Sequence, residues 1–191
     1  MRIFLLLILL FASYILGSIQ GSWIASVYIY KDTKRARDWK EYKALHTFDR
    51  ERVPVVLIDG VKIIIPCLLF LILSPYFQME SSLLTLLGGG FATIGHIFPF
   101  FRKGEGEAME AFIITALFTS FPSALVSLVV FMLLYLVFGR KTIPFMVSVF
   151  SFPVVYILFF SPSFLTGILS ILYSVLIVWR QKRAVNKYLL E

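Results

Sequence analysis

Long apolar runs, separated by short polar connections, fill the chain from its first residues to about position 180. A helix that crosses a bilayer needs about 20 apolar residues, because each residue advances it by about 1.5 Å. The pattern therefore predicts an all-α, polytopic membrane protein in a single domain, 1–191. The expected seven spans are 3–28, 54–75, 82–101, 108–121, 123–138, 143–160 and 163–179.

The number of spans depends on how the chain passes residues 121–123. The fourth and fifth expected spans are short, and we expect a tight turn around Pro122 between them. If these two spans were instead one broken helix, the count would fall to six. Hydropathy alone leaves both alternatives open.

The positions of the basic residues favour seven spans. With the N-terminus outside, all of the 18 Lys and Arg residues except Arg2 and Lys62 lie on the cytoplasmic side. Six spans would place the basic pairs at 102–103 and 140–141 on opposite sides. Since cytoplasmic connections carry an excess of Lys and Arg, we expect an outside N-terminus and a cytoplasmic C-terminus, as in a bacterial inner membrane.

Composition supports a membrane location. The chain is 59% hydrophobic, with a mean hydropathy of +0.88, so its excess apolar surface must face lipid. The net charge of +7 then has a topological origin, and we expect no nucleic-acid partner. The long polar stretch, 31–52, is predicted to be cytoplasmic, either as an interfacial element over the site or as a solvated loop that binds anionic lipid.

Two ionisable residues interrupt the second expected span. Asp59 and Lys62 are separated by three positions, so they share one face of a helix. Each charge costs about 2.5–3.5 kcal/mol to insert at the centre of a bilayer. Ionisable residues at such depth are functional candidates, although an interhelical ion pair with a snorkelling lysine is the structural alternative.

The second candidate cluster lies in the connection that follows the third span. Gly104 and Gly106 allow close backbone approach to a ligand, and their N–H groups beside Lys103 favour an anion site. His96 precedes this connection and is expected to brace it. The glycines at 17, 21 and 88–90 are expected to serve close helix packing.

Several kinds of chemistry leave no trace in the sequence. It contains no Walker loop, no G-x-S-x-G elbow and no cluster with metal-ligand spacing. We therefore expect no metal and no cofactor. The single cysteine, Cys67, lies in an apolar run and is expected to be a small buried side chain.

Four short motifs follow one another along the chain. They are Y-I-L-G-S-I-Q-G-S at 14–22, Asp32-Thr33-Lys34, L-I-D-G-V-K at 57–62 and G-H-I-F-P-F-F-R-K-G-E-G-E-A at 95–108. In this order they resemble the L-L-G-S-I-P, D-x-R, L-D-x-x-K-G and G-H-x-F-P-x-F…K-G-G-K-G-x-A patterns of the bacterial acyl-phosphate:glycerol-3-phosphate acyltransferases of the PlsY type. The likeness at 95–108 is the most specific one.

The resemblance implies a seven-span enzyme that transfers a fatty acyl group from acyl phosphate to glycerol 3-phosphate, giving lysophosphatidic acid. It would act at the cytoplasmic face, among membrane lipids and as a monomer. The implied catalytic residues are Asp59, Lys62 and His96; the implied substrate-binding residues are Ser18, Lys34, Lys103, Gly104 and Gly106.

Departures from the family pattern keep two alternatives open. The G-S-G-N segment of the family is replaced after position 34 by R-A-R-D-W-K, without glycine, and the tail lacks the H-R-x-N ending. The chain could thus be an altered or inactive relative that binds lipid or phosphate. A small transporter is the other alternative, in which Asp59 and Lys62 would line a pathway.

Overall fold

The computed structural model describes residues 1–25, 28, 52–100, 108–139, 142–160 and 163–189, and every regular element in these ranges is helical. The all-α prediction is therefore confirmed for this part of the chain. The helices are α1 (Arg2–Ser18), α2 (Gly21–Ile24), α4 (Arg52–Phe77), α5 (Ser81–Ile97), α6 (Ala108–Thr119), α7 (Phe121–Phe138), α8 (Thr142–Phe160) and α9 (Phe164–Leu189).

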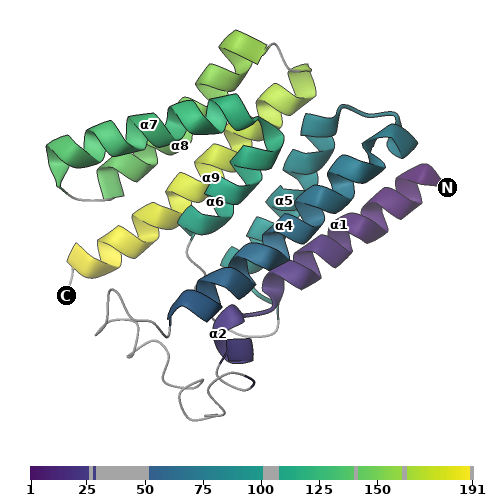
Figure 1. The fold of residues 1–191 in the computed structure, drawn as a ribbon, viewed down its shortest axis with the longest axis horizontal. Coiled ribbons are helices and arrows are strands. Elements are labelled where there is room, and N and C mark those ends of the chain that lie inside the picture. Colours follow the sequence, from purple (N-terminus) through teal and green to yellow (C-terminus); the bar gives the residue numbers. More distant parts are fainter. Residues whose placement is uncertain (26–27, 29–51, 101–107, 140–141, 161–162, 190–191) are drawn as a thin grey trace.

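The helices form two groups joined by a central pair (Figure 1). Helices α1, α4 and α5 pack together on one side, and α7 packs along α8 on the other. Between them, α6 contacts α4, α5 and α7, while α9 contacts α5, α6 and α8. The N-terminal half of the chain is thus one compact group, and the site described below belongs to it.

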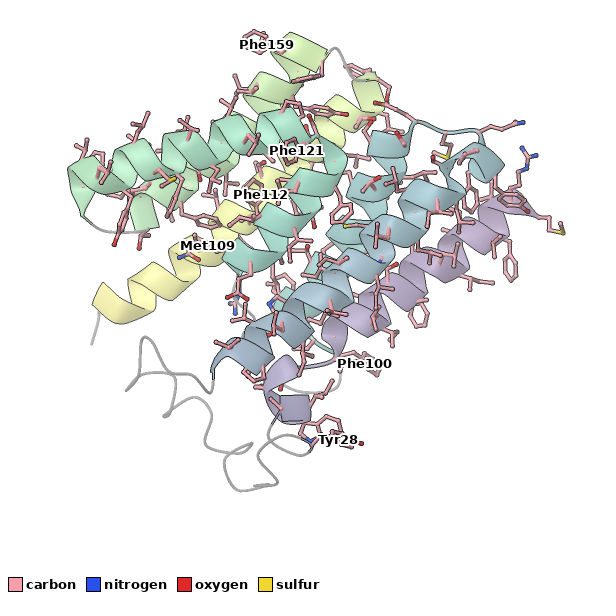
Figure 2. The ribbon with its side chains drawn as sticks, in the orientation of Figure 1. Tyr28, Phe100, Met109, Phe112, Phe121 and Phe159 are labelled. Atoms are coloured by element: carbon pink, nitrogen blue, oxygen red, sulfur yellow. The ribbon has the colours of Figure 1, made fainter. Side chains whose placement is uncertain are left out.

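Among the described residues, four helices are long and apolar enough to cross a membrane, namely α4, α7, α8 and the part of α9 up to Gln181. Three further apolar helices, α1, α5 and α6, are shorter. Many large apolar side chains cover the outside of the helices (Figure 2), and Phe159 on α8 is 76% exposed. Such a surface requires lipid around it, so the chain is a multi-pass membrane protein.

The expected boundaries need two corrections. The first expected span, 3–28, is not one helix, because α1 ends at Ser18 and an extended Ile19 and Gln20 separate it from α2. The expected turn at 121–123 lies earlier: Ser120 is the extended residue, and Pro122 already belongs to the first turn of α7. Proline fits there because the first turn of a helix has no partner for its missing N–H.

Glycines at the contact allow α1 to pack closely against α5, as the small residues of α1 predict. A Cβ on Gly17 would lie 2.0 Å from the carbonyl oxygen of Ala92, and one on Gly95 would lie 2.1 Å from that of Tyr14. Backbone meets backbone at both positions. Small residues permit this approach between membrane helices, where packing rather than water drives association.

The core between the two groups is aromatic, with a polar link at its centre. The ring of Phe112 on α6 stacks on Tyr173 of α9 at 6.0 Å and meets Phe152 of α8 edge-on. The Tyr173 hydroxyl lies 3.0 Å from the Thr93 hydroxyl of α5, which lies 3.3 Å from that of Thr115. These contacts connect α5, α6, α8 and α9 within the apolar interior.

A second polar cluster, centred on Glu80, lies just after the C-terminal end of α4. Oε1 of Glu80 accepts hydrogen bonds from the hydroxyls of Ser82 and, at 3.4 Å, Tyr156. Its Oε2 accepts from the backbone N–H of Ser163 at 3.3 Å and from the Thr166 hydroxyl at 2.9 Å. One carboxylate thereby joins the α4–α5 connection to α8 and α9.

Candidate functional site

The candidate site lies where α1 ends, α2 begins and α4 starts its passage. Ile19 (φ −71°, ψ 123°) and Gln20 (φ −83°, ψ 119°) are extended, so the chain leaves the helical path for two residues. A break of this kind frees backbone groups from the regular i to i−4 hydrogen bonds. In a membrane these groups need partners within the protein.

Asp59 and Lys62 lie about two and three turns into α4 and form an ion pair. Nζ of Lys62 is 2.6 Å from Oδ1 of Asp59, and the two side chains are 5% and 15% exposed. The same ammonium donates to the carbonyl oxygen of Ile19 at 2.7 Å. The lysine therefore does not snorkel to the surface; it points at the helix break.

Asp59 contacts the other side of that break. Its Oδ1 accepts a hydrogen bond from the backbone N–H of Gly21 at 3.1 Å. A Cβ on Gly21 would lie only 2.7 Å from Oδ1 of Asp59 and 2.9 Å from the carbonyl oxygen of Val55. Glycine at position 21 thus lets the start of α2 rest directly on α4.

His96 completes the group from α5. It lies in the last turn of that helix, is 6% exposed, and its Nδ1 is 3.9 Å from Oδ1 of Asp59. The structure thus brings together all three residues that the sequence nominated as catalytic, Asp59, Lys62 and His96, from two helices. Their roles remain predictions.

Ser18 lies beside this group but is held by its own helix. Its side chain is buried, and its hydroxyl donates to the carbonyl oxygen of Tyr14 at 2.8 Å. The following residue is Ile19, whose carbonyl Lys62 binds. Ser18 therefore forms part of the wall of the site, with its proton already engaged.

The remaining predicted substrate-binding residues, Lys34, Lys103, Gly104 and Gly106, lie outside the described residues, as does most of the basic segment 31–52. Their roles stay predictions.

Sequence reasoning missed three contributors to the site. The Ile19 carbonyl and the Gly21 N–H are backbone groups, which no side-chain motif marks. Glu110, in the first turn of α6, adds a second carboxylate to the electrostatic surroundings of Lys62. Its place soon after the glycine-containing connection was the available signal.

Phe98, at the end of α5, contacts both α1 and α9 near the site. The hydroxyl of Tyr14 on α1 donates to its carbonyl oxygen at 3.0 Å. Its ring centroid lies 6.2 Å from that of Trp179 and 6.0 Å from the guanidinium carbon of Arg180, both on α9. The end of α5 is thus fixed between α1 and α9.

The described residues hold no group of three His, Cys, Asp or Glu side chains suited to a metal ion. What the geometry offers is a nearly dry arrangement of a cation, a carboxylate and an imidazole at a helix break. Such an arrangement suits positioning and charge stabilisation of an anionic substrate.

The fold and site define a multi-pass membrane protein with a buried charged site at one end of its helices. The family model described as glycerol-3-phosphate acyltransferase matches residues 7–191. The chain belongs to the glycerol-3-phosphate acyltransferase family, and it is an enzyme of that kind. The resemblance inferred from its motifs is thereby confirmed.

Two solved structures share the fold. Both are crystal structures of PlsY, an integral membrane glycerol 3-phosphate acyltransferase, in its glycerol 3-phosphate form (TM-score 0.71) and its lysophosphatidic acid form (TM-score 0.69). Each is 22% identical in sequence, and the match covers 97% of this chain and 92% of the other. No curated protein sequence matches the chain.

Proposed function

We propose that the chain transfers a fatty acyl group from acyl phosphate to the hydroxyl of glycerol 3-phosphate, giving lysophosphatidic acid. The observation that carries the proposal is the family match over residues 7–191. The convergence of Asp59, Lys62 and His96 at one buried site supports it, because the motifs that contain them resemble those of this family.

The chemistry fits a site without a protein nucleophile. Acyl phosphate is a mixed anhydride, so its carbonyl carbon is already activated. The glycerol hydroxyl oxygen forms the new ester bond, the bond from the carbonyl carbon to the phosphate oxygen breaks, and the departing phosphate takes the hydroxyl proton. The protein then has to align the two substrates and to stabilise their negative charge.

The site residues keep the roles that the sequence predicts for them. Lys103, with a smaller share from Lys62, provides positive charge for phosphate, and Gly104 and Gly106 provide backbone N–H groups. Asp59 orients Lys62, as their 2.6 Å separation supports. His96 braces the connection that follows α5.

Two residues contribute at the edge of the site. The Ser18 hydroxyl donates its hydrogen bond to the backbone carbonyl oxygen of Tyr14, so its oxygen can still accept a hydrogen bond from a substrate hydroxyl. Lys34 adds charge at the entrance. The acyl chain lies between helices in the lipid phase.

For the topology, we propose seven spans with the N-terminus outside and the site at the cytoplasmic face of a bacterial inner membrane. Helices α1 and α5 have 17 residues each, so each extends about 26 Å, close to the hydrocarbon thickness of about 30 Å. Helix α6, with 12 residues, spans only where neighbouring helices cover its ends. The basic residues of the connections support this orientation.

The proposal is tested by supplying the purified protein with palmitoyl phosphate and radiolabelled glycerol 3-phosphate and separating the lipid products. We expect labelled lysophosphatidic acid to accumulate with the wild-type protein. PlsY assayed alongside shows that the substrates are competent. If PlsY forms product and this chain forms none, the proposed reaction is wrong and the chain is an altered relative.

A further inference from the structure

We propose that Asp59 and Lys62 act as positioning residues, bracing the break between α1 and α2 that forms one wall of the site. This inference rests on the proposed function and assigns the pair a role in it. The main role of the Lys62 ammonium is to bind the backbone carbonyl left open at the helix break, and neutralising substrate phosphate is secondary.

The argument begins with the backbone groups at the break. The carbonyl of Ile19 and the N–H of Gly21 flank the extended Gln20, and each has a partner on α4. Lys62 donates to the carbonyl at 2.7 Å, and Asp59 accepts from the N–H at 3.1 Å. Broken helices persist at membrane depth when such groups are re-satisfied by neighbouring side chains.

The arrangement has a direction. A donor must face the Ile19 carbonyl and an acceptor must face the Gly21 N–H, because neither backbone group can exchange its role. A simple ion pair has no such requirement, since its attraction is unchanged when the two charges are swapped. We call the two contacts, Lys62 to the Ile19 carbonyl and Asp59 to the Gly21 N–H, the brace. Exchanging Asp59 and Lys62 therefore distinguishes the brace from a plain salt bridge.

The brace also limits what Lys62 offers to a substrate. An ammonium has three N–H donors, and two of them point at Ile19 and Asp59 within 2.7 Å. Within the described part of the chain one donor remains, and the positive charge is already matched by the adjacent carboxylate. Most of the charge that holds a substrate phosphate must then come from other cations of the site.

Gly21 also contributes to the brace. Its bare Cα lets α2 approach so closely that a Cβ would meet Asp59 and the Val55 carbonyl within 2.9 Å. The neighbouring Gly60 provides a matched control on α4, since among the described residues a Cβ there meets only the terminal methyl of Ile114, at 3.5 Å. Gly21→Ala should displace the break, whereas Gly60→Ala should leave it in place.

Steady-state kinetics distinguish positioning from phosphate binding. A displacement of about 1 Å costs on the order of 100-fold in rate, so Lys62→Met and Gly21→Ala should lower kcat on that order and leave the KM for glycerol 3-phosphate nearly unchanged. The double variant should be no slower than Lys62→Met, because both changes act on one break. Gly60→Ala should retain wild-type kcat.

Two further variants sharpen the test. Lys62→Arg keeps several N–H donors, so it should retain more kcat than Lys62→Met. The swapped Asp59→Lys/Lys62→Asp variant should stay as slow as Lys62→Met. If the swap restores activity, or if Lys62→Met raises KM with kcat unchanged, the brace is wrong.

A structural readout keeps the inference separate from the proposed reaction. Trp23 lies in α2, two residues after Gly21, and its backbone N–H donates to the Gln20 carbonyl oxygen. With Trp39 and Trp179 replaced by phenylalanine, its fluorescence reports on the break. We expect shifted emission and altered acrylamide quenching in Gly21→Ala and Lys62→Met, and no change in Gly60→Ala.

The two measurements distinguish failure of the proposed reaction from failure of the brace. If the wild-type protein makes no lysophosphatidic acid but the Trp23 signal responds as described, the reaction is wrong and the brace stands. If neither Gly21→Ala nor Lys62→Met changes the Trp23 signal, the brace is wrong whatever the activity.

Discussion

A carboxylate at the end of the protein away from the site shows how much one residue can join. Glu80 accepts hydrogen bonds from Ser82, Tyr156, Ser163 and Thr166, which lie on three separate parts of the chain. Partial burial alone would raise the pKa of its carboxyl group, but these hydrogen bonds together lower the pKa below its usual value of 4.5. The ionised form is therefore favoured by the fold.

The direction of that shift gives a pH dependence. Because the folded pKa is below the unfolded one, Glu80 contributes stability that is fully present above about pH 4.5 and is lost as the pH falls through the folded pKa. We expect the thermal midpoint of the detergent-solubilised protein to fall as the pH is lowered below about 4.5. Part of this fall should disappear in Glu80→Gln, and an unchanged pH profile in that variant would contradict the assignment.

At the scale of elements, the contact between α1 and α5 sets where the site residues meet. Gly17 and Gly95 let the two backbones touch, and the ends of the same helices carry Ser18 and His96. A displacement of α1 along α5 would therefore move the helix break relative to Asp59. The packing of one helix pair and the geometry of the site are linked.

A methyl group at this contact tests the link. In Gly17→Ala the added Cβ would lie 2.0 Å from the Ala92 carbonyl oxygen, so α1 must shift. We expect a loss of about 1–3 kcal/mol in stability, as for overpacking elsewhere, and reduced activity, measured by thermal unfolding and the acyl-transfer assay.

Gly90→Ala is the matched control for that change, because a Cβ there meets only the Tyr173 ring at 3.9 Å. Equal behaviour of the two variants would show that the α1–α5 approach is not constrained.

At the scale of the whole molecule, α9 is tied to the rest of the protein at three levels. Glu80 accepts a hydrogen bond from Thr166 at one end, Tyr173 contacts Thr93 of α5 and the Phe112 ring of α6 in the middle, and Trp179 contacts Phe98 at the site end. Since these ties run along the length of the helices, the charged site rests on a rigid support.

The proposed orientation can be checked by cysteine labelling, because the native Cys67 is buried and should not react. We expect an impermeant maleimide to label Ser81→Cys, beside the α4–α5 connection, on intact cells or spheroplasts. It should label Gln181→Cys, near the end of the apolar part of α9, only after the membrane is permeabilised. The reverse pattern would overturn the proposed topology.

The sequence by itself determined the class of fold and most of its elements. Apolar runs of sufficient length must become helices in lipid, since backbone groups there need internal partners. The separation of α6 from α7 followed from charge, because six spans would have divided the basic connections between the two sides. Asp59 and Lys62 were marked by the cost of charge in an apolar segment.

Only the tertiary structure decided how the site is built. The first apolar run continues to about position 30 without proline, so nothing local predicts a break at Ile19 and Gln20. That break is stabilised by side chains about 40 residues away, through Asp59 at Gly21 and Lys62 at Ile19. Periodicity and propensity describe neighbours along the chain, whereas this contact depends on which helices come to lie side by side.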